Sequence, residues 1–136
     1  MRRVLIAALA LAGCAVTPPA TAPSAPIAGV DWVVDQVAGQ SDLGGRPPTL
    51  RIEEDRASGF AGCNRWFSTV SQDGAALSFS ATGATRMLCQ PDAMRIERAF
   101  LDQIRVASSA RREGDALIVF DAAGAEILRL SLAYTP

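Results

Sequence analysis

Apolar and polar residues alternate over several short stretches of this 136-residue chain, and turn-forming residues separate these stretches. Alternation with a period of two is typical of a β-strand with one buried face. The pattern predicts strands at residues 31–37, 50–52, 58–62, 66–71, 77–80, 83–87, 106–112, 116–120 and 126–133. Two hairpin tips are indicated between them, at the charged run 53–56 and at Asp73-Gly74, because an Asp-Gly pair tolerates positive φ.

One stretch has helical spacing instead. The apolar residues between positions 91 and 105 recur three or four positions apart: Ala93, Ile96, Phe100, Leu101 and Ile104. This spacing places them on one face of a helix that packs against a sheet. Pro91 suits the first helical turn, and Gln90 or Asp92 is a candidate for the N-terminal cap.

These elements predict a mainly-β fold. Eight or nine short strands with frequent turns favour a small antiparallel barrel, closed or partly open, with one packed helix at about residues 91–105. The alternative is a two-layer α+β sheet.

The first 14 residues have the organisation of a signal sequence. Two arginines precede an apolar run at residues 4–12, which is too short to cross a bilayer of about 30 Å as a stable helix. The run ends in the letters LAGC, whose cysteine is Cys14. This stretch resembles the lipobox of bacterial lipoproteins, which implies that Cys14 receives a diacylglyceryl group and becomes the new N-terminus. The alternative is an ordinary secretory signal cleaved near Ala20.

The lipobox interpretation divides the chain into three parts: residues 1–13 as a signal peptide, 14–29 as a lipid-anchored tether rich in Ala, Pro and Thr, and 30–136 as one domain. The tether has no charge and a reach of roughly 45 Å at ~3.1 Å per residue. We expect a periplasm-facing protein of the bacterial cell envelope. Ala15 stands where an aspartate often signals inner-membrane retention in such lipoproteins, which favours the outer membrane.

Two cysteines remain beyond the anchor, Cys63 and Cys89. An isolated pair in an oxidising compartment predicts one disulfide. The alternative is two buried free thiols.

Composition restricts the chemistry available to the chain. It has no histidine, which removes the usual general base near neutral pH and the commonest zinc ligand. All 13 basic residues are arginine, so Schiff-base and Ser–Lys catalysis are excluded. The carboxylates of Asp31, Glu53, Glu54 and Glu97 show no arrangement typical of a catalytic pair. We therefore predict no catalytic residue, no metal site and no cofactor, and the net charge of −1 argues against nucleic acid as a partner.

Three blocks of residues carry a resemblance to a known family. They are Gly59-Phe60-Ala61-Gly62-Cys63-Asn64-Arg65, Thr85-Arg86-Met87-Leu88-Cys89 and the stretch 94–101, which contains Glu97. In this order they resemble the META domain, also called the HslJ-like family. The motif positions are Gly59, Gly62, Cys63, Asn64, Arg65, Thr85, Arg86, Met87, Cys89 and Glu97.

The resemblance implies a small lipocalin-like β fold with one helix, an envelope setting and a link to stress or drug tolerance. It implies no reaction. The chain departs from the family where the family tends toward a glycine and then a tyrosine, since Ser68 and Val70 stand there. A surface built around that tyrosine is altered in this chain.

The motif also has a structural interpretation. Gly59 and Gly62 permit a bulge or a close backbone approach. Asn64 and Thr85 have side chains that satisfy backbone groups at a bend. Glu97 is expected to pair with Arg65 or Arg86 where they share a face.

The sequence is compatible with three functions. The first is a non-enzymatic envelope lipoprotein that acts in stress tolerance or binds an envelope protein. The second is a carrier of a small apolar ligand or lipid, which needs an enclosed cavity. The third is a protease inhibitor of similar barrel shape, with the N-terminal tether as its binding segment. We expect a monomer held at the membrane through Cys14.

Overall fold

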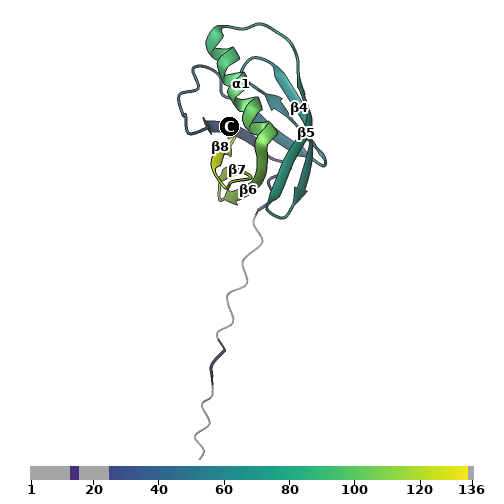
Figure 1. Ribbon diagram of the computed structural model, residues 1–136, viewed down its shortest axis with the longest axis vertical. Coiled ribbons are helices and arrows are strands. Elements are labelled where there is room, and N and C mark those ends of the chain that lie inside the picture. Colours follow the sequence, from purple (N-terminus) through teal and green to yellow (C-terminus); the bar gives the residue numbers. More distant parts are fainter. Residues whose placement is uncertain (1–12, 16–24, 135–136) are drawn as a thin grey trace, which may run out of the picture.

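The computed structural model describes residues 13–15 and 25–134. This part of the chain forms a barrel of eight strands and one helix (Figure 1). In chain order the elements are β1 (Asp31–Val37), β2 (Thr49–Glu53), β3 (Arg56–Phe60), β4 (Arg65–Asp73), β5 (Ala76–Ala84), α1 (Pro91–Val106), β6 (Ala107–Glu113), β7 (Ala116–Asp121) and β8 (Glu126–Leu132). The predicted signal peptide lies outside the described residues except for Gly13, as does the tether from 16 to 24.

Each strand pairs antiparallel with the next along the chain, and β8 pairs with β1 to close the barrel. The junction of β5 and β6 is short, because Ala76 and Ser109 form the one register pair between them. The predicted mainly-β fold, a small antiparallel barrel with one packed helix, is confirmed. The two-layer α+β alternative is wrong.

The two predicted hairpin tips are present. Glu54 adopts a φ of 54° between β2 and β3, and Gly74 adopts a φ of 57° between β4 and β5. A residue in the left-handed conformation lets the chain reverse its direction within a short turn, so that the next strand runs antiparallel to the one before it. These tight connections keep neighbouring strands adjacent in the barrel.

The helix α1 connects β5 to β6 and packs against β5 and β1. Its buried face includes Ile96, Phe100, Leu101 and Ile104, as the helical spacing predicts. Proline occupies the first turn, but the expected side-chain cap is absent, since Gln90 stands at the N-cap position without a side-chain hydrogen bond. Among the described residues no helix has the length and apolar character needed to cross a bilayer.

The interior of the barrel is a packed core. Trp32, Trp66 and Phe100 are at most 1% exposed. The Trp66 ring meets Phe100 edge-on at a centroid distance of 5.3 Å and Phe79 at 6.1 Å. Such aromatic pairs add to the free energy gained by burying their surface. The helix therefore contributes a large side chain, Phe100, to the same core as the strands.

The folded domain begins before residue 30, which corrects the boundary expected from composition. Ile27 is 7% exposed and belongs to the core cluster. Its carbonyl accepts a hydrogen bond from Trp32 Nε1 at 2.9 Å, and the Gly29 backbone N–H donates to Ile52 O at 2.8 Å. The buried side chain of Ile27 and these two hydrogen bonds together hold the segment on the barrel.

The separate strand predicted at residues 83–87 is absent. Gly83 and Ala84 complete β5, and residues 85–90 run on without a regular element, bend or turn. A strand does not form at Met87 because its backbone N–H and carbonyl both bond to the side chain of Asn64 rather than to a neighbouring strand.

Candidate functional site

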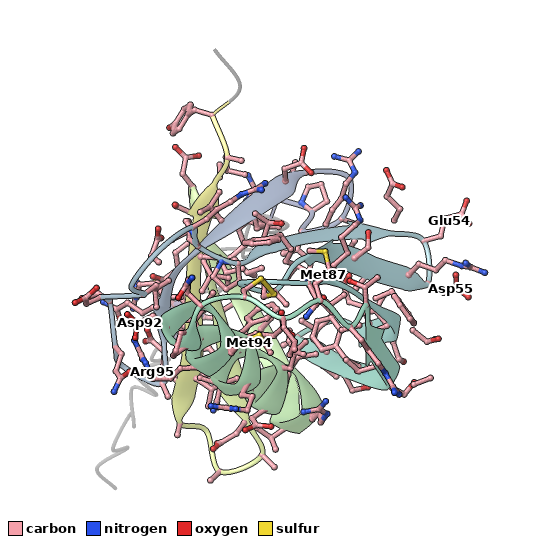
Figure 2. All side chains as sticks on the ribbon, turned by 90° about the horizontal axis from the view of Figure 1, so that it is seen from above. Glu54, Asp55, Met87, Asp92, Met94 and Arg95 are labelled. Atoms are coloured by element: carbon pink, nitrogen blue, oxygen red, sulfur yellow. A yellow bond between two sulfur atoms is a disulfide. The ribbon has the colours of Figure 1, made fainter. Side chains whose placement is uncertain are left out.

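The motif residues of the three sequence blocks meet at one end of the barrel. The turn after β3, the segment of residues 85–90 and the first half of α1 pack together there. In Figure 1 this segment arches over the end of the barrel opposite the one where the chain enters at residue 25. Figure 2 looks down on this end, with Met87 near the centre of the view. We call Cys63, Asn64, Cys89 and Glu97 the brace.

The first bond of the brace is a disulfide. The sulfurs of Cys63 and Cys89 are 2.02 Å apart and the Cα atoms 5.9 Å apart. The disulfide predicted from the cysteine pair is therefore present, and the free-thiol alternative is wrong. It joins the turn after β3 to the end of the connecting segment.

Reduction of this disulfide should lower the stability of the domain. Closing a loop across a sequence separation of 26 stabilises the folded state by about 3.5 kcal/mol in the loop-entropy model. For a domain of this size that corresponds to a decrease of the melting temperature on the order of 10 °C. Thermal melts with and without reductant measure it. A Cys63→Ala/Cys89→Ala variant should show no response to reductant, and an unchanged wild-type melt would contradict the prediction.

The second element of the brace is the buried carboxylate of Glu97, which is 7% exposed. Its Oε2 accepts hydrogen bonds from the backbone N–H of Cys63 at 3.1 Å and of Asn64 at 2.5 Å. Its Oε1 accepts one from Asn64 Nδ2 at 2.8 Å. Hydrogen bonds to an ionised acceptor are stronger than neutral ones. Glu97 thus fastens α1 to the turn after β3.

The expected pairing of Glu97 with Arg65 or Arg86 is wrong. Both arginines are exposed, and neither forms an ion pair within the described part of the chain. The carboxylate points instead at backbone N–H groups, which turn toward α1 where β3 ends. A carboxylate can satisfy several such donors at once.

The third element is Asn64, whose side chain spans from the turn to the connecting segment. Its Oδ1 accepts from the Met87 backbone N–H at 2.6 Å and from Thr85 Oγ at 3.1 Å, and its Nδ2 donates to Met87 O at 3.2 Å. Thr85 Oγ in turn accepts from the Arg65 N–H at 3.2 Å. Asn64 and Thr85 therefore satisfy backbone groups at the bend, as their residue types suggest.

The two motif glycines allow the close approach that this packing needs. Gly62 has a φ of 128°, and a Cβ there would lie 3.0 Å from both Ala93 O and Glu97 N. A Cβ at Gly59 would lie 2.1 Å from the carbonyl oxygen of Thr49. Any side chain would push the turn away from α1 or separate β3 from β2.

Outside the brace, the connecting segment exposes apolar side chains. Met87 is 58% exposed and Leu88 is 92% exposed. Leu88 was not among the site residues expected from the sequence. The only signal for it was an apolar residue next to a disulfide cysteine in a stretch without periodicity.

Ser68 and Val70, at which the chain departs from the family pattern, have side chains that are buried in the barrel. Both are buried, at 6% and 5% exposed. The Ser68 hydroxyl donates to Ser80 O at 2.8 Å and lies 2.9 Å from Thr82 Oγ. These positions therefore add nothing to the surface near Leu88.

The carboxylates considered as a catalytic pair either bond to other groups of the protein or lie apart from the others. Asp31 and Glu53 both pair with Arg51, at 3.1 and 2.8 Å, and Glu54 is exposed at a hairpin tip. Within the described residues, no three His, Cys, Asp or Glu side chains are grouped so as to hold a metal ion.

Two large hollows lie on the surface of the described residues, both open to solvent. One, of about 900 Å³, lies against β2, β3 and β4 and includes Arg51, Phe67 and Thr69. The other, of about 760 Å³, lies at the end where residue 25 enters and includes Ile27 and Phe120. Neither includes a brace residue.

Comparison with known proteins gives a family and a fold. The family model described as META domain matches residues 25–134. The NMR structure of a protein from Burkholderia xenovorans is similar, with a TM-score of 0.61 and 23% identity over 89% of this chain and 100% of that one. A second NMR structure has a TM-score of 0.59 and 20% identity over 76% of this chain and 88% of that one. At these identities the two structures establish the fold alone. No curated protein matches the sequence significantly.

Proposed function

The chain belongs to the META domain family, and from that premise we propose that it is a lipid-anchored, non-enzymatic protein of the bacterial cell envelope that acts by binding another protein. The domain works as a monomer, and stress tolerance follows from the complex it forms. The observation that carries this proposal is the braced display of Met87 and Leu88 at one end of the barrel.

The location is supported by the sequence and by the disulfide. The apolar run that ends at Cys14 has the length and the small residues of a lipoprotein signal. A disulfide between Cys63 and Cys89 is typical of proteins that fold in an oxidising compartment. The thiol of Cys14 is free and exposed, so no other bond competes with its acylation.

A binding role is supported over a reaction by how the motif residues are used. Glu97 and Asn64 are buried, and each makes several hydrogen bonds to neighbouring residues of the protein. Such groups have little capacity left for a substrate. The chain also has no histidine, so the most common general base is missing.

A protein partner is supported over a small apolar ligand. The barrel interior holds the packed rings of Trp32, Trp66 and Phe100, whereas ligand pockets bury most of their ligand in an enclosed apolar space. The two described hollows are open surface features. Exposed Met and Leu side chains on a rigid segment suit a protein interface instead.

Site-specific cross-linking in intact cells tests the proposal. A photoreactive residue in place of Leu88 should give a discrete cross-linked species, because Leu88 would be buried in the complex. The same residue in place of Val106, an apolar residue that is 53% exposed on α1, is the matched control and should give none. Absence of any product specific to position 88 would contradict the proposal, as would a reproducible turnover of a substrate by the purified protein.

A further inference from the structure

Two neighbouring residues of the brace hold the residues on either side of Leu88. The side chain of Asn64 binds the backbone of Met87: its Oδ1 accepts from the Met87 N–H at 2.6 Å, and its Nδ2 donates to the Met87 carbonyl at 3.2 Å. Cys63 binds Cys89 through the disulfide. Leu88 lies between these two fixed points and is 92% exposed. The chain is thus fastened immediately before and immediately after Leu88, the most exposed large apolar side chain among the described residues.

This fastening also sets the direction of the backbone groups. Residues 85–90 run without a bend or turn, and successive residues of an extended chain point their polar groups to opposite edges. The backbone N–H and carbonyl of Met87 both point inward to Asn64. The alternation therefore places the backbone N–H and carbonyl groups of Arg86 and Leu88 on the opposite, outer edge of the segment. Within the described residues, no hydrogen bond occupies the backbone N–H or carbonyl of Arg86 or Leu88.

An extended segment with one free edge and a projecting side chain is the form in which a peptide adds to the edge of a partner sheet. Peptidase substrate clefts bind peptides in this way, with backbone hydrogen bonds to alternate residues and a pocket for one side chain. Because the brace holds the segment in this form before binding, little conformational entropy is lost on association.

We propose that residues 86–90 form an inhibitory loop that enters the substrate cleft of an endopeptidase, with Leu88 in the pocket for the residue before the cleaved bond. The pocket must be apolar and large enough for leucine. This inference rests on the proposed protein-binding function and names the class of partner.

The brace explains why such a loop inhibits instead of being consumed. Hydrolysis of the Leu88–Cys89 bond adds one water and gives a carboxylate on Leu88 and an amino group on Cys89. The carboxylate side stays attached through Met87 to Asn64, and the amino side stays attached through the disulfide to Cys63. The two new ends therefore remain close together, at a high effective concentration that favours re-formation of the bond. The cleaved loop also keeps its place in the cleft.

The location differs from the one that the sequence suggested for an inhibitor. The tether was the expected binding segment, but its last residues are fixed on the barrel through Ile27. The loop lies at the other end of the domain (Figure 1), so it is directed away from the point where the chain leaves toward the anchor.

Inhibition assays with the full protein, purified in detergent, test this inference. Chymotrypsin and subtilisin, which cut after large apolar residues, are the probes, and trypsin, which cuts after Arg, is the counter-probe. The wild type should inhibit at least one of the first two and leave trypsin active. Leu88→Arg should weaken that inhibition by at least ~30-fold, as expected for a central interface residue, and should create inhibition of trypsin. Val106→Arg, the same change at another exposed apolar residue, should alter neither.

Mass spectrometry of the same mixtures locates any cleavage. Slow cleavage at Leu88–Cys89 with the two parts still joined supports the inference. No inhibition of either apolar-specific enzyme, rapid degradation through this bond, or inhibition that Leu88→Arg leaves unchanged would overturn it. Cross-linking of Leu88 to a partner that is not a peptidase would also overturn it, while leaving the proposed protein-binding function intact.

Discussion

Replacement of Glu97 by alanine should lower the free energy of unfolding by roughly 4–6 kcal/mol. The carboxylate accepts three hydrogen bonds, from two backbone N–H groups and from the amide of Asn64. The variant leaves the two backbone N–H groups buried without an acceptor, leaves the Asn64 amide with Met87 O as its acceptor, and removes the polar link between α1 and the turn after β3. Chemical denaturation followed by circular dichroism measures the loss through the transition midpoint.

Two variants make this prediction specific. Glu97→Gln keeps one acceptor oxygen and the shape of the side chain, so we expect a smaller loss of about 1–2 kcal/mol. It also provides a measurable variant if Glu97→Ala does not fold. Glu126→Ala removes a carboxylate that pairs with Arg129 at the surface, and its cost should stay below about 1 kcal/mol. Equal midpoints for Glu97→Ala and Glu126→Ala would show that the brace contributes no stability.

The regular elements were predictable because their causes are local. The Asp73-Gly74 turn and the apolar stripe of α1 depend on residues close together in the chain, and both are present as expected. The barrel follows from the number and spacing of such elements. Its closure between β8 and β1 is a long-range pairing that no short stretch of sequence encodes by itself.

The brace was predictable only as a set of residues. The motif blocks brought together Cys63, Asn64, Cys89 and Glu97, but the partner of Glu97 was expected to be an arginine. Charge alone favours that pairing. The actual partners are two backbone N–H groups and the side-chain amide of Asn64. The direction of the two N–H groups depends on the left-handed φ of Gly62 and its contact with α1. Such a direction is a property of the folded turn and cannot be obtained from residue type.

Leu88 was missed for a related reason. Sequence reasoning assigns importance to polar residues, cysteines and periodic apolar residues, and Leu88 is none of these. Its position becomes meaningful only when Met87 and Cys89 are both seen to be fixed on neighbouring residues of one turn. The brace and the exposed leucine are therefore one feature, in which buried polar contacts hold an apolar side chain in solvent.

Cys14→Ser should release the protein from membranes completely, the largest functional effect that we expect. Acyl chains bind a bilayer with about 0.8 kcal/mol for each buried methylene, so two or more chains give lasting attachment. A serine has no thiol to receive the diacylglyceryl group. Fractionation of cells into membrane and soluble parts measures the change, and mass spectrometry of the mature N-terminus identifies the modification directly.

The neighbouring Ala15→Ser variant is the matched control, because it introduces the same residue one position later and leaves the thiol in place. It should remain with the membranes. The domain of the Cys14→Ser protein should keep its melting temperature, because Cys14 lies outside the barrel and the Cys63–Cys89 disulfide is untouched. Release of the Cys14→Ser protein with an unchanged melting temperature would show that anchoring and folding are independent. Inhibition of an endopeptidase by the released protein would then show that the loop of residues 86–90 acts without the membrane. Membrane retention of Cys14→Ser would instead mean that attachment depends on another part of the chain.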